Sequence, residues 1–291
     1  MNTCFGTQHI NKKHGKYKSM EDMSHNYHTV LSIAGSDSSG GAGIQADIKS
    51  ICANGGYAAS VITATTAQNT QGVTDIHAIP IPHLIAQMEA VFSDIHFNTV
   101  KIGMLHSSEV IDAVQSTLEK YPVKNIVLDP VMVATSGDTL IDENAIERLK
   151  AFLPHVTLIT PNIPEAQILI GHDINLENLE QTAQEIGKKY HVSVLLKGGH
   201  LELTERMTDA LYNHSTHKVS LIQNPAIKTI NTHGTGCTLS SAIATYLAHG
   251  ETLENAVIQS CTYLNKAIEA GKDMKLGAGH GPVNHFGGVH D

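Results

Sequence analysis

The sequence predicts an α/β fold with three layers, in which helices cover both faces of a central, mostly parallel β-sheet. Short apolar runs rich in β-branched residues alternate with segments of helical periodicity along most of the 291 residues. Several of these runs are almost continuously apolar, which is typical of parallel strands that are buried on both faces. Repeated strand–helix units of this kind place helices on both sides of a parallel sheet.

The elements follow from the spacing of apolar residues. Helices are predicted over residues 142–153 and 251–271, and from Cys237 to Gly250, because apolar side chains recur there every three or four positions. Gly271 is expected to cap the last of these helices. The predicted strands are residues 28–35, 99–105, 125–133, 156–162 and 192–199.

The domain organisation is expected to be simple. Residues 1–27 are polar and lack the apolar centre of a signal peptide, so we expect a flexible N-terminal extension. No internal repeat and no linker rich in Pro, Gly or Ser interrupts the remainder. Residues 28–291 are therefore expected to form a single domain.

Composition narrows the classes of function. Hydrophobic residues make up 41% and charged residues 16% of the chain, which is typical of a globular protein. The formal net charge of −9 argues against nucleic acid as a partner, and no apolar run is long enough to cross a membrane. The four cysteines form no CxxC motif, which favours reduced thiols and a cytoplasmic location.

Polar residues follow four of the predicted strands. Asp37, Asp129, Asn162 and Lys197 each come after an apolar run. Because ligands of open parallel sheets bind beyond the carboxyl ends of the strands, the site is expected at this edge. The opposing interpretation is that these residues form ordinary turns.

Two glycine-rich stretches point to the same edge. Residues 234–237, Gly-Thr-Gly-Cys, open a predicted helix, whose unpaired amides and positive dipole end favour anions. The same field is expected to lower the pKa of the Cys237 thiol, although a glycine turn beside a buried cysteine fits the sequence equally well. Residues 35–47 match neither GxGxxG nor GxxxxGK[ST], and Asp47 is expected to be a solvated helix residue.

Three oxygen-bearing side chains suggest a cation site. Asp129 follows one predicted strand, Asn162 and Glu165 follow another, and carboxylate and amide oxygens suit Mg²⁺, usually through water. Lys197, followed by two glycines, supplies a cation at the same edge.

Together, these motifs resemble those of a known family. Eight blocks between residues 29 and 286 occur in the order seen in hydroxymethylpyrimidine/phosphomethylpyrimidine kinases of thiamine biosynthesis, members of the ribokinase-like superfamily with its three-layer α/β/α fold. The resemblance implies that ATP and Mg²⁺ are used to phosphorylate 4-amino-5-hydroxymethyl-2-methylpyrimidine and then its monophosphate. It also implies a homodimer. The blocks are IAGSDSSGGAGIQADIK, VITATTAQNTQGV, VKIGML, VLDPVMVATSGD, LITPNIPEA, LLKGGH, NTHGTGCTLSSAIA and GHGPVNHF.

The resemblance implies a role for individual residues. Cys237 stands where most of the superfamily has an aspartate base, and Gly234, Thr235 and Gly236 match the anion hole. Lys197 matches a lysine near the ATP phosphates. The positions matching the nucleotide and magnesium region are Asn162, Glu165 and Asp129, with Asp129 and Glu165 expected to hold Mg²⁺ through water. The positions matching the pyrimidine pocket are Gln68, Gly35, Asp47, Met104 and Val131.

Other functions remain open from the sequence. Pyridoxal kinases share the fold, and their substrates are also small heteroaromatic rings with a hydroxymethyl group. A cysteine hydrolase or transferase would use Cys237 as nucleophile and His233 as base. A non-catalytic binding module would bind without turnover. A kinase must exclude water from its site, because water would otherwise hydrolyse ATP, and the loop at 134–138 is the expected lid. Some relatives have lysine at the position of Thr135. If that lysine offsets phosphate charge in them, this chain must do so by other groups.

Overall fold

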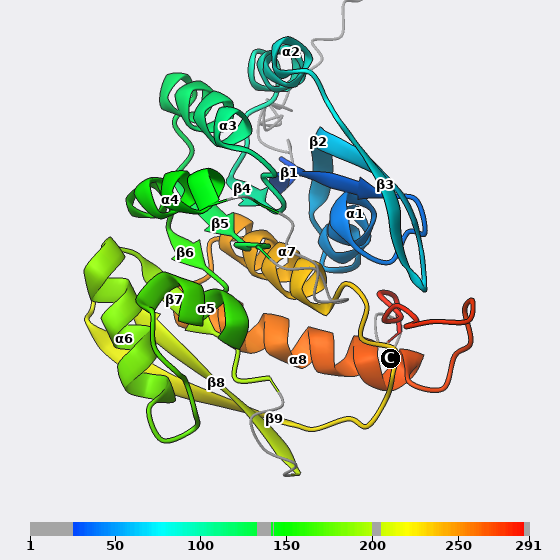
Figure 1. Ribbon diagram of the computed structural model, residues 1–291, viewed down its shortest axis with the longest axis vertical. Coiled ribbons are helices and arrows are strands. Elements are labelled where there is room, and N and C mark those ends of the chain that lie inside the picture. The colour runs from blue at the N-terminus through cyan, green and yellow to red at the C-terminus, as the bar shows by residue number, and fades with distance from the viewer. Residues whose placement is uncertain (1–25, 133–140, 142, 200–204, 288–291) are drawn as a thin grey trace, which may run out of the picture.

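A single nine-stranded sheet organises the part of the chain that the computed structural model describes, namely residues 26–132, 141, 143–199 and 205–287. The strand order is β3-β2-β1-β4-β5-β6-β7-β8-β9 (Figure 1). The strands are β1 (Thr29–Asp37), β2 (Tyr57–Asn69), β3 (Gly72–Ala78), β4 (Thr99–Ile102), β5 (Asn125–Leu128), β6 (Leu158–Ile159), β7 (Ser193–Leu196), β8 (Arg206–Asn213) and β9 (Lys218–Pro225). The α-helices are α1 (Gly43–Ala53), α2 (Ile81–Phe92), α3 (Ser108–Lys120), α4 (Glu143–Phe152), α5 (Ile163–Ile170), α6 (Leu179–Tyr190), α7 (Thr235–Ala248) and α8 (Leu253–Gly271).

The central strands are parallel, as the sequence predicts. Strands β2, β1, β4, β5, β6 and β7 pair in parallel, while β3 pairs antiparallel with β2. Strands β8 and β9 extend the other edge in antiparallel fashion. The carboxyl ends of the parallel strands therefore lie at one edge of the sheet, where the site residues were expected.

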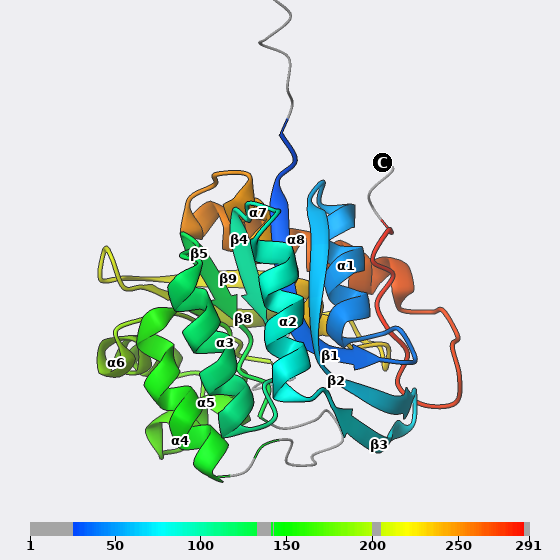
Figure 2. The same ribbon diagram turned by 90° about the horizontal axis from the view of Figure 1, so that it is seen from above.

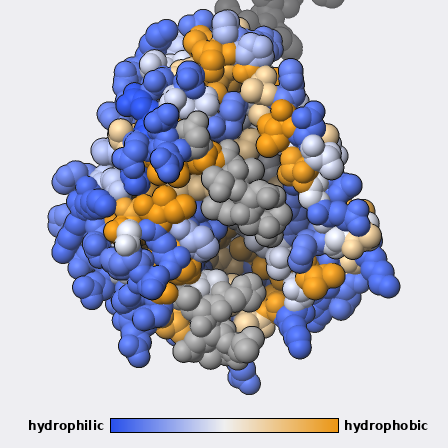
Figure 3. All heavy atoms as spheres, in the orientation of Figure 1, coloured by the Kyte–Doolittle hydropathy of each residue, from blue (hydrophilic) through white to orange (hydrophobic). Residues whose placement is uncertain are grey.

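Helices cover both faces of the sheet and complete three layers (Figure 2). Residues that alternate along β1 enter different cores, because successive side chains of a strand point to opposite faces. Val30 belongs to the hydrophobic cluster that includes residues of α1, α7 and α8, whereas Leu31 and Ile33 belong to the cluster that includes residues of α2 to α6. On the face seen in Figure 3, hydrophilic side chains predominate and hydrophobic ones form small scattered groups.

The predicted strands and helices are present, most of them shorter than expected. One detail was wrong: Gly271 does not cap α8 but is its last residue, and Lys272 follows with right-handed helical angles. Gly271 instead permits a close approach, because a Cβ there would lie 2.7 Å from the Asn284 nitrogen. The antiparallel hairpins were missed, since β3 is almost wholly exposed and lacks a buried apolar face.

Two expectations fall on parts of the chain that the structure leaves out. The predicted extension, apart from residues 26 and 27, and the predicted lid at 134–138 lie outside the described residues. Among the described residues, no helix is both long enough and apolar enough to cross a bilayer.

Candidate active site

Asp129 and Lys197 lie together at the carboxyl ends of β5 and β7. Lys197 Nζ is 3.1 Å from Asp129 Oδ1, and the Thr160 hydroxyl donates to the same oxygen at 2.8 Å. Asp129 is only 3% exposed. Burial would raise the pKa of its carboxyl, but the Lys197 and Lys101 ammonium groups outweigh burial and hold the pKa below its ordinary value.

Asn162 and Glu165 begin α5 beside this ion pair. The Asn162 side chain accepts from the Glu165 amide at 2.9 Å, and Glu165 Oε2 accepts from the Asn162 amide at 2.8 Å, forming a capping box. Asn162 also forms a parallel bridge with Lys197. Burial raises the pKa of Glu165 to about 7, although Lys197 opposes the rise. The edge thus holds two buried carboxyl groups around one lysine.

The first turn of α7 lies directly over the Asp129–Lys197 pair. A Cβ on Gly236 would lie 3.1 Å from Asp129 Oδ2 and 3.3 Å from Lys197 Nζ. Gly234 adopts a left-handed conformation, with φ of 78°, and a Cβ there would lie 1.9 Å from the Gly41 carbonyl oxygen. Glycine at both positions therefore lets the helix end approach the ion pair and the loop after β1.

Cys237 follows in the same turn and is partly buried. Burial raises the pKa of its thiol to about 11, despite the opposing effects of the Lys101 ammonium and the Gly43 amide. The expectation that the helix end would lower this pKa was wrong. The field of a helix end is modest, whereas removing a thiolate from water costs more.

Most of the predicted pyrimidine-pocket residues gather at the same edge. A Cβ on Gly35 would lie 2.8 Å from the Met104 Cε, so these two residues are in contact. Val131 donates its amide to the Asp129 carbonyl at 2.8 Å. On β2, Gln68 Oε1 accepts from the Thr66 hydroxyl at 3.1 Å, and its Nε2 lies 3.4 Å from His233 Nε2.

Asp47 differs from its expected setting. It is fully buried, not solvated, and both of its carboxylate oxygens accept from Lys101 Nζ, at 2.7 and 2.8 Å. Further donors are the hydroxyls of Ser32, at 2.6 Å, and Ser241, at 2.8 Å. Both carboxylate oxygens of Asp47 therefore accept hydrogen bonds from groups of the protein itself rather than from a ligand.

Sequence reasoning missed Lys101 and the network around Asp37. Lys101 stands inside an apolar strand run, and such a cation in a buried strand is itself a signal that could have been used. Asp37 accepts from the amides of residues 39, 41 and 42 and lies 2.9 Å from His233 Nε2. This nitrogen of His233 therefore interacts with the Asp37 carboxylate rather than with the thiol of Cys237.

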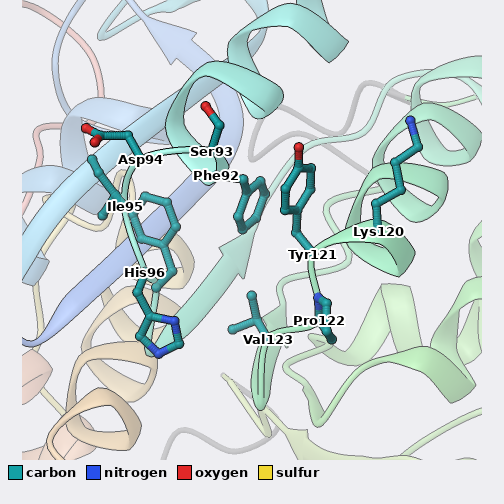
Figure 4. Close-up of a pocket in the computed structure, with 10 residues that line it drawn as sticks. Phe92, Ser93, Asp94, Ile95, His96, Lys120, Tyr121, Pro122 and Val123 are labelled. Carbon is teal, nitrogen blue, oxygen red and sulfur yellow. The ribbon is translucent and has the colours of Figure 1, made fainter.

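A surface cavity elsewhere has no connection with these groups. The cavity in Figure 4 has a volume of about 360 Å³ and lies where α2 and α3 end, ahead of β4 and β5. It is thus at the amino ends of the parallel strands, the edge opposite to the one where ligands of such sheets bind. Residues 92–97 and 120–123 line it.

Comparisons with known proteins identify the relatives of this chain. A family model described as phosphomethylpyrimidine kinase matches residues 37–284. The hydroxymethylpyrimidine/phosphomethylpyrimidine kinase of Rhizobium meliloti is 48% identical over 262 residues, covering 88% of this chain and 96% of that protein. The chain spans 53% of a thiamine biosynthesis bifunctional protein of Geobacter sulfurreducens, and 34% of a multifunctional one of Corynebacterium glutamicum.

Solved structures give the same result. A phosphomethylpyrimidine kinase from Clostridium difficile superimposes with a TM-score of 0.73 at 42% identity, covering 82% of this chain and 99% of that one. An ADP complex of Bacillus subtilis pyridoxal kinase gives a TM-score of 0.84 at 29% identity, covering 91% and 100%. The architecture is thus that of the ribokinase-like kinases, and the chain belongs to the phosphomethylpyrimidine kinase family.

Proposed function

We propose that this protein transfers the γ-phosphoryl group of ATP to 4-amino-5-hydroxymethyl-2-methylpyrimidine and then to its monophosphate, in thiamine biosynthesis. Relatives named as kinases of these compounds match most of the chain. One observation carries the proposal: the first turn of α7 lies against Lys197 and Asp129, at the carboxyl edge of the sheet. A helix N-terminus beside a cation supports this function, because both groups can stabilise negative charge during phosphoryl transfer.

Lys197 and the α7 amides would stabilise the negative charge of the transferring phosphoryl group. Phosphoryl transfer needs positioning and charge stabilisation more than covalent chemistry. The amides of a first helical turn lack acceptors within the helix. The Thr235 amide donates to the Thr232 carbonyl at 3.3 Å, so the amides of Gly236 and Cys237 are the ones proposed to bind the anion. Nucleotide use by this fold is supported by structures of Staphylococcus aureus pyridoxal kinase in complex with ADP and with AMP-PCP.

Asp129 and Glu165 are the residues that would hold Mg²⁺. Hard oxygen donors suit this ion, which keeps several waters and takes substrate phosphates as ligands. Oδ1 of Asp129 is engaged by Lys197 and Thr160, while Oδ2 faces Gly236. Across the described residues there is no cluster of three or more His, Cys, Asp or Glu side chains suited to a metal. Contact through water therefore fits the donor set, and the ion would neutralise phosphate charge.

Cys237 is proposed as the base for the first phosphorylation. Its thiolate would accept the proton of the substrate hydroxymethyl group as the oxygen attacks the γ-phosphorus and ADP departs. In the second phosphorylation the acceptor is a phosphate monoester, whose second pKa is about 6, so no proton has to be removed near neutral pH. The two steps are therefore expected to depend on the thiol to different extents.

Gln68 is proposed to recognise the pyrimidine. Its side-chain amide provides donors and an acceptor, which match a ring nitrogen beside an exocyclic amine. Gly35, Met104 and Val131 would supply the walls of the pocket. The implied contact of Asp47 with substrate stays a prediction, since its oxygens are engaged by Lys101, Ser32 and Ser241.

Pyridoxal phosphorylation is the second candidate function. It is favoured by the TM-score of 0.84 with Bacillus subtilis pyridoxal kinase. A cysteine hydrolase or transferase activity has less support, because His233 Nε2, its expected base, is held by Asp37.

A homodimer is also proposed, on the basis of the family resemblance.

Replacement of Cys237 tests the proposed chemistry. In Cys237→Ala, the rate of the first phosphorylation should fall by roughly 10²–10⁴-fold, the usual cost of losing a general base. The second phosphorylation, measured on the same preparation, should fall far less and thus serves as the internal control. Equal losses in both steps would assign Cys237 to phosphate binding, and near-normal activity in both would remove it from the mechanism.

A further inference from the structure

A buried ion pair lies beneath the proposed site without a role in the chemistry described above. Lys101 of β4 and Asp47 of α1 are both 0% exposed, and their atoms approach to 2.7 Å. Burying two charges is costly, and an apolar pair of similar volume is often no less stable. The pair therefore calls for an explanation beyond stability.

Contacts between α1 and α7 fix the position of the pair relative to Cys237. The Gly43 amide of α1 faces the Cys237 thiol and favours its thiolate, and the Ser241 hydroxyl of α7 donates to Asp47 at 2.8 Å. Gly43 and Asp47 are four residues apart, as are Cys237 and Ser241. The two helices thus meet in two successive contacts, about one helical turn, or 5.4 Å, apart.

Cys237 therefore lies about one helical turn of α7 away from Ser241, the residue that contacts the ion pair. An opposite charge within about 4–6 Å favours the charged form of a titrating group. A Cβ on Gly103 would lie 3.0 Å from Lys101 Nζ, so the ammonium is directed toward the strand end where the site lies. The Lys101 ammonium lowers the pKa of Cys237 more than the Asp47 carboxylate raises it, so the pair as a whole favours the thiolate.

Other charged groups also face the thiol. Asp129 of β5 raises the pKa of Cys237, whereas Lys197 of β7 interacts favourably with its thiolate. Lys197 is shared with Asp129 and Glu165. In contrast, Lys101 forms its ion pair with Asp47, below the site.

We propose that Lys101 is a positioning residue for the reaction: its buried ammonium, held by Asp47, stabilises the thiolate of Cys237. Ser32 and Ser241 complete the support by donating to Asp47. The inference rests on the proposed role of Cys237 as base, because only a base benefits from a stabilised thiolate.

The test measures the thiol directly, by its rate of alkylation. The double variant Lys101→Met/Asp47→Asn removes both charges and leaves no unpaired charge in the core. Iodoacetamide labelling at fixed pH is followed for each cysteine by peptide mass spectrometry, with exposed Cys52 as the reference in the same sample. Labelling of Cys237 relative to Cys52 should slow by about tenfold, which corresponds to a rise of about one unit in the pKa of the Cys237 thiol. An unchanged ratio in a folded double variant would overturn the proposal.

A second variant predicts the opposite sign. Asp47→Asn removes the counter-charge of Lys101, whose ammonium is still favoured by the Asp129 carboxylate and by the Cys237 thiolate, so this thiolate should be more favoured and labelling faster. Ser241→Ala, which removes one hydrogen bond and no charge, should leave the ratio close to that of the unaltered protein. Slower or unchanged labelling in Asp47→Asn would contradict the proposal, including where the double variant does not fold.

The outcome is separable from the proposed function. Labelling reports the thiolate whether or not Cys237 acts as a base, while the Cys237→Ala rates report the base role independently. A normal first phosphorylation in Cys237→Ala, combined with slow labelling of the double variant, would keep the electrostatic effect and reject the base. Full loss in Cys237→Ala with unchanged labelling would keep the base and reject Lys101.

Discussion

Glu165 and Asp129 show how two neighbouring carboxyl groups acquire different proton affinities. Both are 3% exposed, so burial penalises the charged form of each. Asp129 has the closer lysine contact, and its pKa falls, whereas burial raises the pKa of Glu165 to about 7. The pair therefore combines one fixed negative charge with one group that titrates near neutrality.

The raised pKa of Glu165 predicts a pH-dependent stability. The folded protein holds the Glu165 proton more tightly than the unfolded chain, whose glutamate pKa is about 4.3. The free energy of unfolding should therefore decrease as pH rises from about 4.3 toward 7. In Glu165→Gln this contribution is absent, while Gln can preserve the capping box.

Denaturant unfolding at several pH values checks this prediction. The difference in unfolding free energy between Glu165→Gln and the unaltered protein should grow in favour of the variant as pH increases over that interval. A constant difference would show that Glu165 is not proton-linked to folding.

At the level of single residues, the sequence predicts which side chains gather at the carboxyl edge of the sheet better than it predicts their burial or pKa. Asp129, Asn162 and Lys197 were identified by a local rule, because each follows an apolar strand. Burial of Asp47 was not predictable in this way, since it depends on Lys101, which lies 54 positions away in the chain. The pKa of Cys237 likewise reflects desolvation by the assembled fold.

At the level of elements, the two glycine-rich stretches act together. The loop after β1 and the first turn of α7 approach so closely that a Cβ on Gly234 would lie 1.9 Å from the Gly41 oxygen. Glycine at 234 is therefore required both by its left-handed conformation and by the contact. The sequence predicted each stretch as a loop, but the contact between them requires the sheet.

Gly234→Ala tests this junction. The left-handed conformation costs a non-glycine residue about 1–2 kcal/mol, and the clash would add to this and displace the anion-binding turn. Gly250→Ala is the matched control, because its φ is 89° and a Cβ there meets nothing within 4 Å. We expect a similar conformational cost in both, but a greater loss of unfolding free energy and of phosphoryl transfer in Gly234→Ala. Equal losses would mean that the junction contributes nothing beyond backbone strain.

The antiparallel hairpins mark the limit of prediction for elements. Most of the buried parallel strands are recognisable in the sequence as apolar runs. Helices α4, α7 and α8 are recognisable by the helical spacing of their apolar residues. Strand β3 shows an almost wholly exposed pattern, and β9 has one buried residue. Their pairing is specified by neighbouring strands rather than by a local apolar pattern.

At the level of the whole molecule, the parallel sheet brings together residues from most of the chain. Gln68, Asp129, Glu165, Lys197 and Cys237 come from five separate segments and lie at one edge because the strands share a direction. The order of the strands could not be read from the sequence pattern, but the three-layer class and the edge at which the predicted site residues gather could. Under the proposed function, substrate choice should depend on this edge, and it is the property to measure on the intact protein.

The most direct test of the account is ATP consumption by the purified protein with Mg²⁺, measured in parallel with hydroxymethylpyrimidine, its monophosphate and pyridoxal. We predict turnover with both pyrimidines and a lower kcat/KM with pyridoxal. Turnover with pyridoxal but with neither pyrimidine would contradict the proposed substrate and require a different role for Gln68.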